Sequence, residues 1–155
     1  MNAYDRDMAK ELSEGAADVW IALMRAQQTA LLKIERGFRE AKLPPLSWYD
    51  VLWELERAGE TGLRPFEIET RMLIAQSNIS RLIDRLEKEG YVKRRPCEED
   101  ARGQHVVMTP SGREMRRRMW PVYAKALREA VGQRVSAREA TMLEGLLEKL
   151  ADKRH

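Results

Sequence analysis

The spacing of hydrophobic residues along the chain predicts a mostly helical protein. Apolar residues from Leu12 to Phe38 recur at three-residue, four-residue or roughly two-turn intervals, and nothing interrupts them before Pro44 and Pro45. This spacing predicts one long amphipathic helix. The rest of so short a chain can hardly cover a helix of that length. Its apolar stripe therefore predicts a partner subunit.

Shorter helices are predicted over the next segment. Ser47 is a good N-cap for a helix over residues 48–57, and Asp50 falls in its first turn. Glycines then mark a turn, and a short helix is predicted from Pro65 through Met72.

The middle of the chain combines an oily stripe with a polar face. Ile79, Leu82, Ile83 and Leu86 fall at positions i, i+3, i+4 and i+7 of one predicted helix that ends at Gly90. The opposite side of that helix carries Ser77, Ser80, Arg81, Asp84 and Lys88, with Asn78 and Arg85 at its margin. The stripe predicts core, and the polar face is left for solvent or for a partner.

Two strands and two further helices complete the predicted elements. The strands, residues 91–95 and 104–109, are joined by the polar loop PCEEDARG and form a hairpin. Pro110 opens a helix that Pro121 bends or splits. Ser136 then begins the last helix with a capping box. The apolar stripe of that helix is Met142, Leu143, Leu146, Leu147 and Leu150.

Composition and charge narrow the function classes. With 43% hydrophobic and 34% charged residues, 155 residues suit a globular α or α+β protein. One cysteine and two histidines exclude an internal disulfide and a cysteine zinc cage, so we expect no metal and no cofactor. No signal peptide or membrane-spanning run is present, which predicts a cytoplasmic protein without a membrane partner. No catalytic motif appears either, so we do not expect an enzyme.

Positive charge is concentrated in the middle of the chain. Residues 75–118 hold 11 basic against 7 acidic residues, whereas residues 1–74 hold 10 basic against 13 acidic ones. This asymmetry predicts an anionic partner for the central segment.

Two short helices followed by a cationic hairpin are typical of a helix-turn-helix with a wing that reads double-stranded DNA. The predicted base contacts lie in the second helix and its approach: Ser77, Ser80 and Arg81, flanked by Gln76 and Asn78. Arg85, at the margin of the same face, is a further predicted DNA contact. In the hairpin, Arg102 is expected to enter the minor groove with Asp100 as its anchor, while Lys93, Arg94 and Arg95 contact phosphates.

The chain resembles the MarR family of bacterial transcriptional regulators over nearly its whole length. The segments that carry the resemblance are GLRPFEIETRM, NISRLIDRLEKEGYVKRR and DARGQHVVMTPSG. The resemblance implies a winged-helix homodimer whose terminal helices form the interface, with a small-molecule pocket between that interface and the DNA-binding lobe. It places an N-terminal dimerisation helix at 1–45, the DNA-binding lobe at 46–112 and C-terminal dimerisation helices at 113–155. The implied function is a repressor that binds a pseudo-palindromic operator and is released by an effector.

The family pattern is not matched everywhere. Ala75 stands where a capping Ser or Thr is common, and Phe66 stands where a cap would open the preceding helix. Trp20, Trp48 and Trp53 are expected in the core. Trp20 and Trp48 also fall where the family lines its pocket, so we predict an aromatic or phenolic effector there.

Several alternatives remain open from the sequence. Cys97, followed by acidic residues, is expected to be an exposed and inert loop thiol rather than a redox switch. Arg81 and Lys88 both have the helical spacing to pair with Asp84, which would make the polar face a merely solvated one. A winged-helix module that docks another protein, or a small helical enzyme or ligand sensor without specific DNA binding, would also have this composition.

Overall fold

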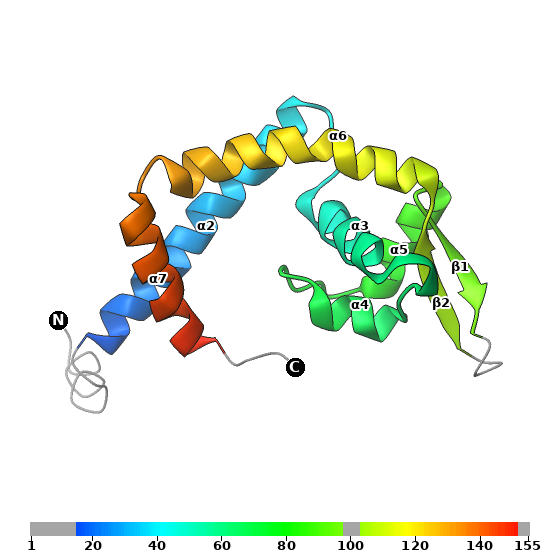
Figure 1. Cartoon of the computed structure of the whole chain (residues 1–155), viewed down its shortest axis with the longest axis horizontal. Coiled ribbons are helices and arrows are strands. Elements are labelled where there is room, and N and C mark those ends of the chain that lie inside the picture. The colour runs from blue at the N-terminus through cyan, green and yellow to red at the C-terminus, as the bar shows by residue number, and fades with distance from the viewer. Residues whose placement is uncertain (1–14, 98–102, 152–155) are drawn as a thin grey trace. The chain divides into compact units, whose positions relative to one another are not determined.

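The computed structural model describes residues 15–97 and 103–151, and it confirms a mostly helical fold with one small antiparallel sheet (Figure 1). The chain forms two compact units. One consists of Met1–Ile34 with Leu127–His155, and the other is the continuous segment Glu35–Ala126. The three-part division at residues 45 and 112 stays a prediction.

The unit Glu35–Ala126 contains the predicted helix-turn-helix and hairpin. Its elements follow the chain as the end of α2 (Ala16–Glu40), α3 (Leu46–Ala58), η1 (Gly59–Thr61), α4 (Pro65–Arg71), α5 (Ile79–Lys88), β1 (Val92–Pro96), β2 (Gln104–Met108) and most of α6 (Pro110–Leu127). Every predicted helix and strand of this unit is present, with bounds that differ by a few residues at most.

The core of this unit is made of the residues that the apolar spacing selects. Leu82, Ile83 and Leu86 of α5 are buried, as predicted for its stripe, whereas Ile79 at its start is only half-buried. They share the core with Phe38, Val51, Leu52, Leu55, Ile68, Val92, Val106 and Met119. Because each of these elements buries one face only, their outer faces remain available for function.

Helix α3 begins two residues before the predicted start. Pro45 is its N-cap, and the amide of Leu46 donates to the Glu35 carboxylate at 3.1 Å. Glu35 thus accepts a hydrogen bond from an amide at the start of the helix, where the first turn has no backbone acceptor of its own. The prediction that Ser47 caps this helix was wrong, since Ser47 lies inside it.

Gly62 brings η1 close to the hairpin. Its φ is +70°, and a Cβ at this position would collide with the carbonyl of Val106 and with the Val107 side chain. The next residue, Leu63, exchanges two backbone hydrogen bonds with Val106, so it extends the sheet on the free edge of β2. The sheet is therefore fastened to η1 by backbone contacts that leave no room for a larger residue at 62.

Pro121 lies within α6 and does not split it. The helix runs unbroken from Pro110 to Leu127, and a π-helical turn, η2 (Arg128–Gly132), follows it. At its start, Thr109 accepts a hydrogen bond from the Gly112 amide, which confirms the predicted opening at Pro110.

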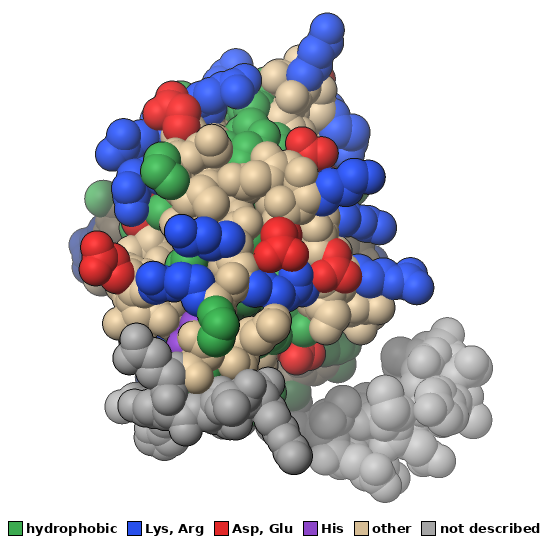
Figure 2. All heavy atoms as spheres, turned by 90° about the vertical axis from the view of Figure 1, so that its right-hand side faces the viewer, with side chains coloured by type: hydrophobic (Ala, Val, Ile, Leu, Met, Phe, Trp, Pro, Cys, Tyr) green, Lys and Arg blue, Asp and Glu red, His purple; other side chains and the backbone are tan. Residues whose placement is uncertain are grey.

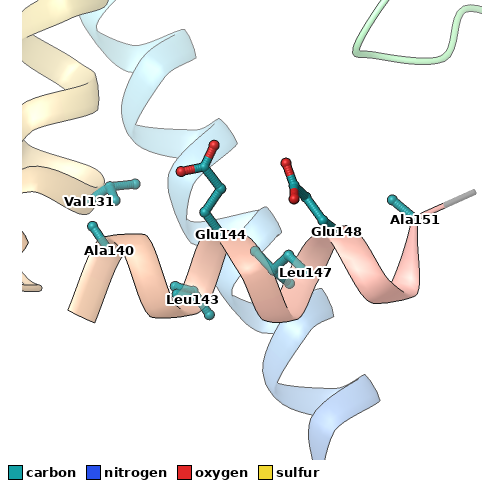
Figure 3. A pocket seen from close by; sticks show the side chains of 7 residues that line it. All are labelled: Val131, Ala140, Leu143, Glu144, Leu147, Glu148 and Ala151. Carbon is teal, nitrogen blue, oxygen red and sulfur yellow. The ribbon is translucent and has the colours of Figure 1, made fainter. Parts of the chain in front are cut away.

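In the unit Met1–Ile34 with Leu127–His155, the described helices leave large apolar side chains uncovered. Helix α7 (Ala137–Leu150) begins with the predicted capping box, in which Ser136 and Glu139 bond each other's backbone amides. Its predicted stripe from Met142 to Leu150 is exposed in the single chain. Part of this stripe lines a hollow of about 430 Å³, with Leu143 and Leu147 beside Val131 (Figure 3). No helix in the described part of the chain has the length and apolar content that a membrane crossing requires.

Candidate nucleic-acid interface

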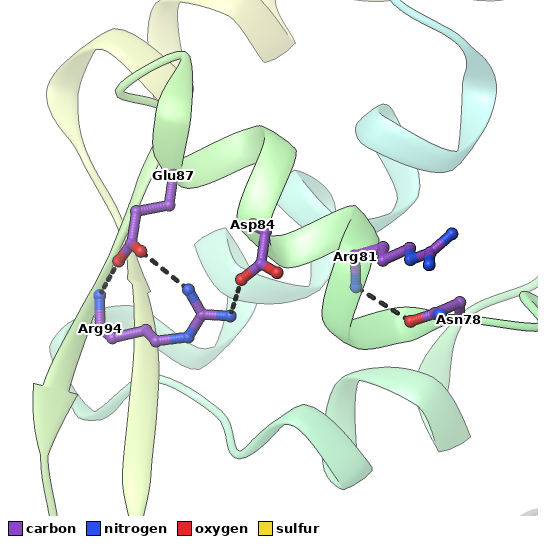
Figure 4. Close-up of polar contacts among 5 residues, drawn as sticks. All are labelled: Asn78, Arg81, Asp84, Glu87 and Arg94. Carbon is purple, nitrogen blue, oxygen red and sulfur yellow. Dashed lines mark hydrogen bonds and ion pairs between the residues drawn. The ribbon is translucent and has the colours of Figure 1, made fainter.

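The N-terminus of α5 is set by Asn78. Its side-chain oxygen accepts a hydrogen bond from the amide of Arg81 at 3.0 Å, the geometry of a helix N-cap (Figure 4). Gln76 and Ser77 therefore precede the helix, and the prediction that Ser77 lies on its polar face was wrong. Asn78 itself takes the capping role that is missing at Ala75.

The outward face of α5 is polar and free of helical ion pairs. Ser80, Arg81 and Arg85 are exposed on it. The alternative in which Arg81 and Lys88 pair with Asp84 is not what the structure shows, because Asp84 pairs with Arg94 instead. Within residues 15–97 and 103–151, no ion pair involves Arg81, and its guanidinium points away from Asp84 (Figure 4).

Arg94 links β1 to α5. Its guanidinium donates to Asp84 at 2.6 Å and to Glu87 at 2.8 Å, and its backbone amide donates to Glu87 at 3.1 Å (Figure 4). The Arg94 side chain is 23% exposed, against 64% for Asp84 and 41% for Glu87. Arg94 is thus the least exposed residue of this cluster, and its positive charge lies between the two carboxylates.

The three cations of β1 do not share one face, because side chains alternate along a strand. Arg94 points to α5, whereas its neighbour Arg95 donates to the backbone carbonyl of Glu60 in η1. Lys93 is exposed. Of the three predicted phosphate contacts, only Arg94 forms an ion pair among the described residues, and Lys93 is the one whose side chain forms neither an ion pair nor a hydrogen bond there.

Basic and acidic side chains are interspersed over the side of the molecule that carries the hairpin (Figure 2). The sequence placed Asp100 and Arg102 at the tip of this hairpin, and both lie outside the described residues.

Asp50 is a site residue that the sequence interpretation missed. It is buried in α3, and its carboxylate accepts hydrogen bonds from the amides of Leu73, at 2.8 Å, and Ile74, at 3.1 Å. Burial raises the pKa of Asp50, and the two amide hydrogen bonds partly oppose that rise. Asp50 therefore ties α3 to the turn between α4 and α5. The contact joins residues 23 and 24 positions apart, so no local spacing indicates it.

The tryptophans are not all core residues, contrary to the prediction. Trp20 is 62% exposed and Trp53 is 40% exposed in this chain. The Arg116 guanidinium lies 5.3 Å from the centre of the Trp53 ring, and Trp48 packs edge-on against Tyr91. A helix buries a side chain only where another element packs on it, and Trp20 of α2 stays largely exposed in the single chain. The role of Trp20, Trp48 and Trp53 in an effector pocket stays a prediction.

Cys97 is buried, so the prediction of an exposed loop thiol was wrong. It directly follows β1, and its backbone amide donates to the carbonyl of Gly103 across the hairpin at 2.9 Å. Its sulfur lies 3.6 Å from a guanidinium nitrogen of Arg64. The thiol lies against a residue 33 positions away in the chain, so the acidic residues that follow Cys97 in the sequence do not reveal its burial. Over the described part of the chain, no group of His, Cys, Asp or Glu residues is arranged to hold a metal ion.

Comparisons with known proteins agree with this geometry. Residues 42–103 match the model of the MarR family. The regulator PrsX of Escherichia coli is 36% identical over 86 residues, which cover 56% of this chain and 52% of PrsX, about half its length. The transcriptional repressor MprA of Escherichia coli is 28% identical over 79% of this chain and 69% of its own length. These relatives are named as regulators of transcription, not as enzymes.

A solved structure extends the likeness to nearly the whole fold. A MarR family regulator from Streptomyces coelicolor, crystallised in complex with DNA, superposes with a TM-score of 0.79 and is 28% identical, over 90% of this chain and 87% of its own. The superposition confirms the winged helix. In its matching core segment, helix order and wing, the chain is similar to regulators of the MarR family.

Proposed function

We propose that this protein is a DNA-binding regulator of transcription that uses α5 as its recognition helix. The observation that carries the proposal is how α5 is held: its buried stripe fixes it to the unit and Asn78 caps its first turn, while Ser80, Arg81 and Arg85 face outward. A helix fixed in this way fits the major groove, where guanidinium groups recognise guanine.

The contacts have different expected roles. Arg81 and Ser80 would reach base edges, as would Gln76 and Ser77 just before the helix, and Arg85 would lie at the margin of the groove. Lys93 and Arg95 would contact phosphates. The tip residues Asp100 and Arg102 keep their predicted minor-groove role. Asn78 supports recognition through its cap, because its oxygen already accepts the Arg81 amide.

A homodimer is the proposed active form. The exposed apolar stripe of α7 supports it, because a soluble chain rarely leaves so many large apolar side chains facing water. Two recognition helices related by a two-fold axis read half-sites about 10 bp apart. Such a dimer would occlude a promoter in the cytoplasm, and an effector that alters the spacing of its recognition helices would release it.

Selection from a pool of random duplexes tests the proposal. At low salt the purified protein should enrich a pseudo-palindromic sequence. Its affinity for that sequence should fall by about 0.9 log units per log unit of salt for each phosphate neutralised. Enrichment of no sequence would exclude the function. Binding of all duplexes alike would show a non-specific DNA-binding protein.

A further inference from the structure

The recognition face of α5 carries a chemical conflict that Arg94 resolves. Asp84 and Glu87 are three residues apart and therefore lie on neighbouring positions of one side of the helix. Both are partly exposed, at 64% and 41%, beside the residues that would approach phosphates. Two unbalanced carboxylates there would repel DNA. Arg94 holds both of them at 2.6 and 2.8 Å.

A direct phosphate contact by Arg94 does not fit this geometry. Two of its guanidinium nitrogens already donate to carboxylates, and the side chain is only 23% exposed. To reach a phosphate, Arg94 would have to leave both carboxylates uncompensated at the moment when they meet negative charge. The neighbouring Lys93 is exposed and has no such commitment among the described residues.

We propose that Arg94 is a positioning residue: it neutralises Asp84 and Glu87 on the recognition helix and fastens the hairpin to that helix, and it does not itself bind phosphate. This proposal rests on the proposed DNA-binding function. It predicts that Arg94 matters for affinity only while the two carboxylates are present.

The structure allows the charge to be separated from the fold. The backbone amide of Arg94 also donates to Glu87, and this bond survives a change of the Arg94 side chain. Glutamine at position 87 keeps an oxygen that accepts it. The substitutions Asp84→Asn and Glu87→Gln therefore remove charge with little change in shape, and Arg94→Gln removes the guanidinium but keeps a polar, uncharged side chain.

The test is a cycle of four proteins measured on the duplex that the wild type selects: wild type, Arg94→Gln, Asp84→Asn with Glu87→Gln, and the triple variant. Arg94→Gln should weaken binding roughly tenfold or more, because like charges then face each other across the interface. In the carboxylate-free background the same change should cost less than about threefold, since its partners are gone. Equal losses in both backgrounds would overturn the proposal and make Arg94 a phosphate contact.

Lys93→Gln is the matched control. It removes one cation from the same strand, and its loss of affinity should be the same in both backgrounds, because Lys93 forms no ion pair among the described residues. A merely structural Arg94 would also be distinguished. Neutralising its partners would then mimic Arg94→Gln, whereas we expect the carboxylate-free variant to bind at least as tightly as the wild type.

Failure of the proposed function gives a different result. If the wild type selects no duplex, DNA binding is excluded for every variant. The free energies of unfolding of the same four proteins then test only whether Arg94 fastens the hairpin to α5. If Arg94→Gln and the carboxylate changes alter the free energy of unfolding additively, the fastening role is overturned. If their effects are coupled, that role is supported.

Discussion

Single residues near α5 divide into those that hold the helix and those that are left for a partner. Asn78 and Arg94 have their polar atoms engaged within the chain, whereas Arg81 points outward with no ion pair among the described residues. Residue type alone does not separate these groups, because an arginine suits a carboxylate as well as a phosphate. The structure separates them by showing which partner each side chain already has.

Arg81→Ala should lower affinity for the selected duplex and also relax the base preference at one position of each half-site. An arginine that binds guanine through two hydrogen bonds contributes about 1–3 kcal/mol of discrimination against the wrong base. Lys93→Ala should instead weaken binding to all duplexes alike and reduce the salt dependence by about one unit. Competition binding against single-base variants measures both. A uniform loss for Arg81→Ala would reassign it to a phosphate.

Helices and strands are positioned both by contacts that local sequence patterns predict and by contacts between distant segments, which such patterns do not predict. The stripe of α5, the hairpin and the capping box of α7 follow from local spacing, and all are confirmed. Asn78 also had a local signal, since Asn is among the preferred N-caps. The polar residues before it obscured that signal. The tether from Asp50 to the turn joins distant segments, so local spacing does not indicate it. The prediction that Asp50 lies in the first turn of α3 was wrong, because the helix begins at Leu46.

Asp50→Ala should destabilise the unit Glu35–Ala126 by about 1–3 kcal/mol, because it leaves the amides of Leu73 and Ile74 without their acceptor. Asp50→Asn should cost less, since one amide oxygen can accept both bonds. Chemical denaturation measures the difference. Amide hydrogen exchange at residues 73 and 74 shows whether the loss of stability arises there. If these amides exchange as slowly in the alanine variant as in the wild type, the tether is contradicted.

The same carboxyl predicts a pH dependence. Burial raises the pKa of Asp50 from an ordinary value of 3.8. The folded state then binds this proton more readily than the unfolded state, so the contribution to stability is complete below the ordinary pKa and is lost as the pH rises through the raised one. Asp50→Asn removes the titration. Between pH 4 and pH 7 the stability of the wild type should therefore fall relative to that variant. A constant difference would show that burial does not raise the pKa of this carboxyl.

At the scale of the whole molecule, the exposed apolar stripe of α7 and the surplus of basic residues lie in different parts of the chain. The large exposed apolar residues of α7 lie in one unit, and the surplus of basic residues lies in the segment 75–118 of the other. The apolar stripe of α7 was predicted from its spacing, but its exposure follows only from the structure. A single chain therefore has one surface suited to association and another suited to an anionic partner.

Replacing both Leu143 and Leu147 with Glu should convert a dimer to a monomer. These side chains are 43% and 37% exposed in the single chain, so the change costs the isolated unit little, whereas in a dimer it buries charge without a partner. Light scattering should show half the wild-type mass, and affinity for the two-half-site duplex should fall at least a hundredfold, because the second half-site no longer binds as part of the same molecule. Glu144→Gln with Glu148→Gln is the control, since it changes the same hollow without losing apolar surface. That variant should stay dimeric. A wild type that is already monomeric would mean that operator binding needs only one recognition helix. A double glutamate variant that keeps the dimer mass would mean that the dimer forms without this part of α7.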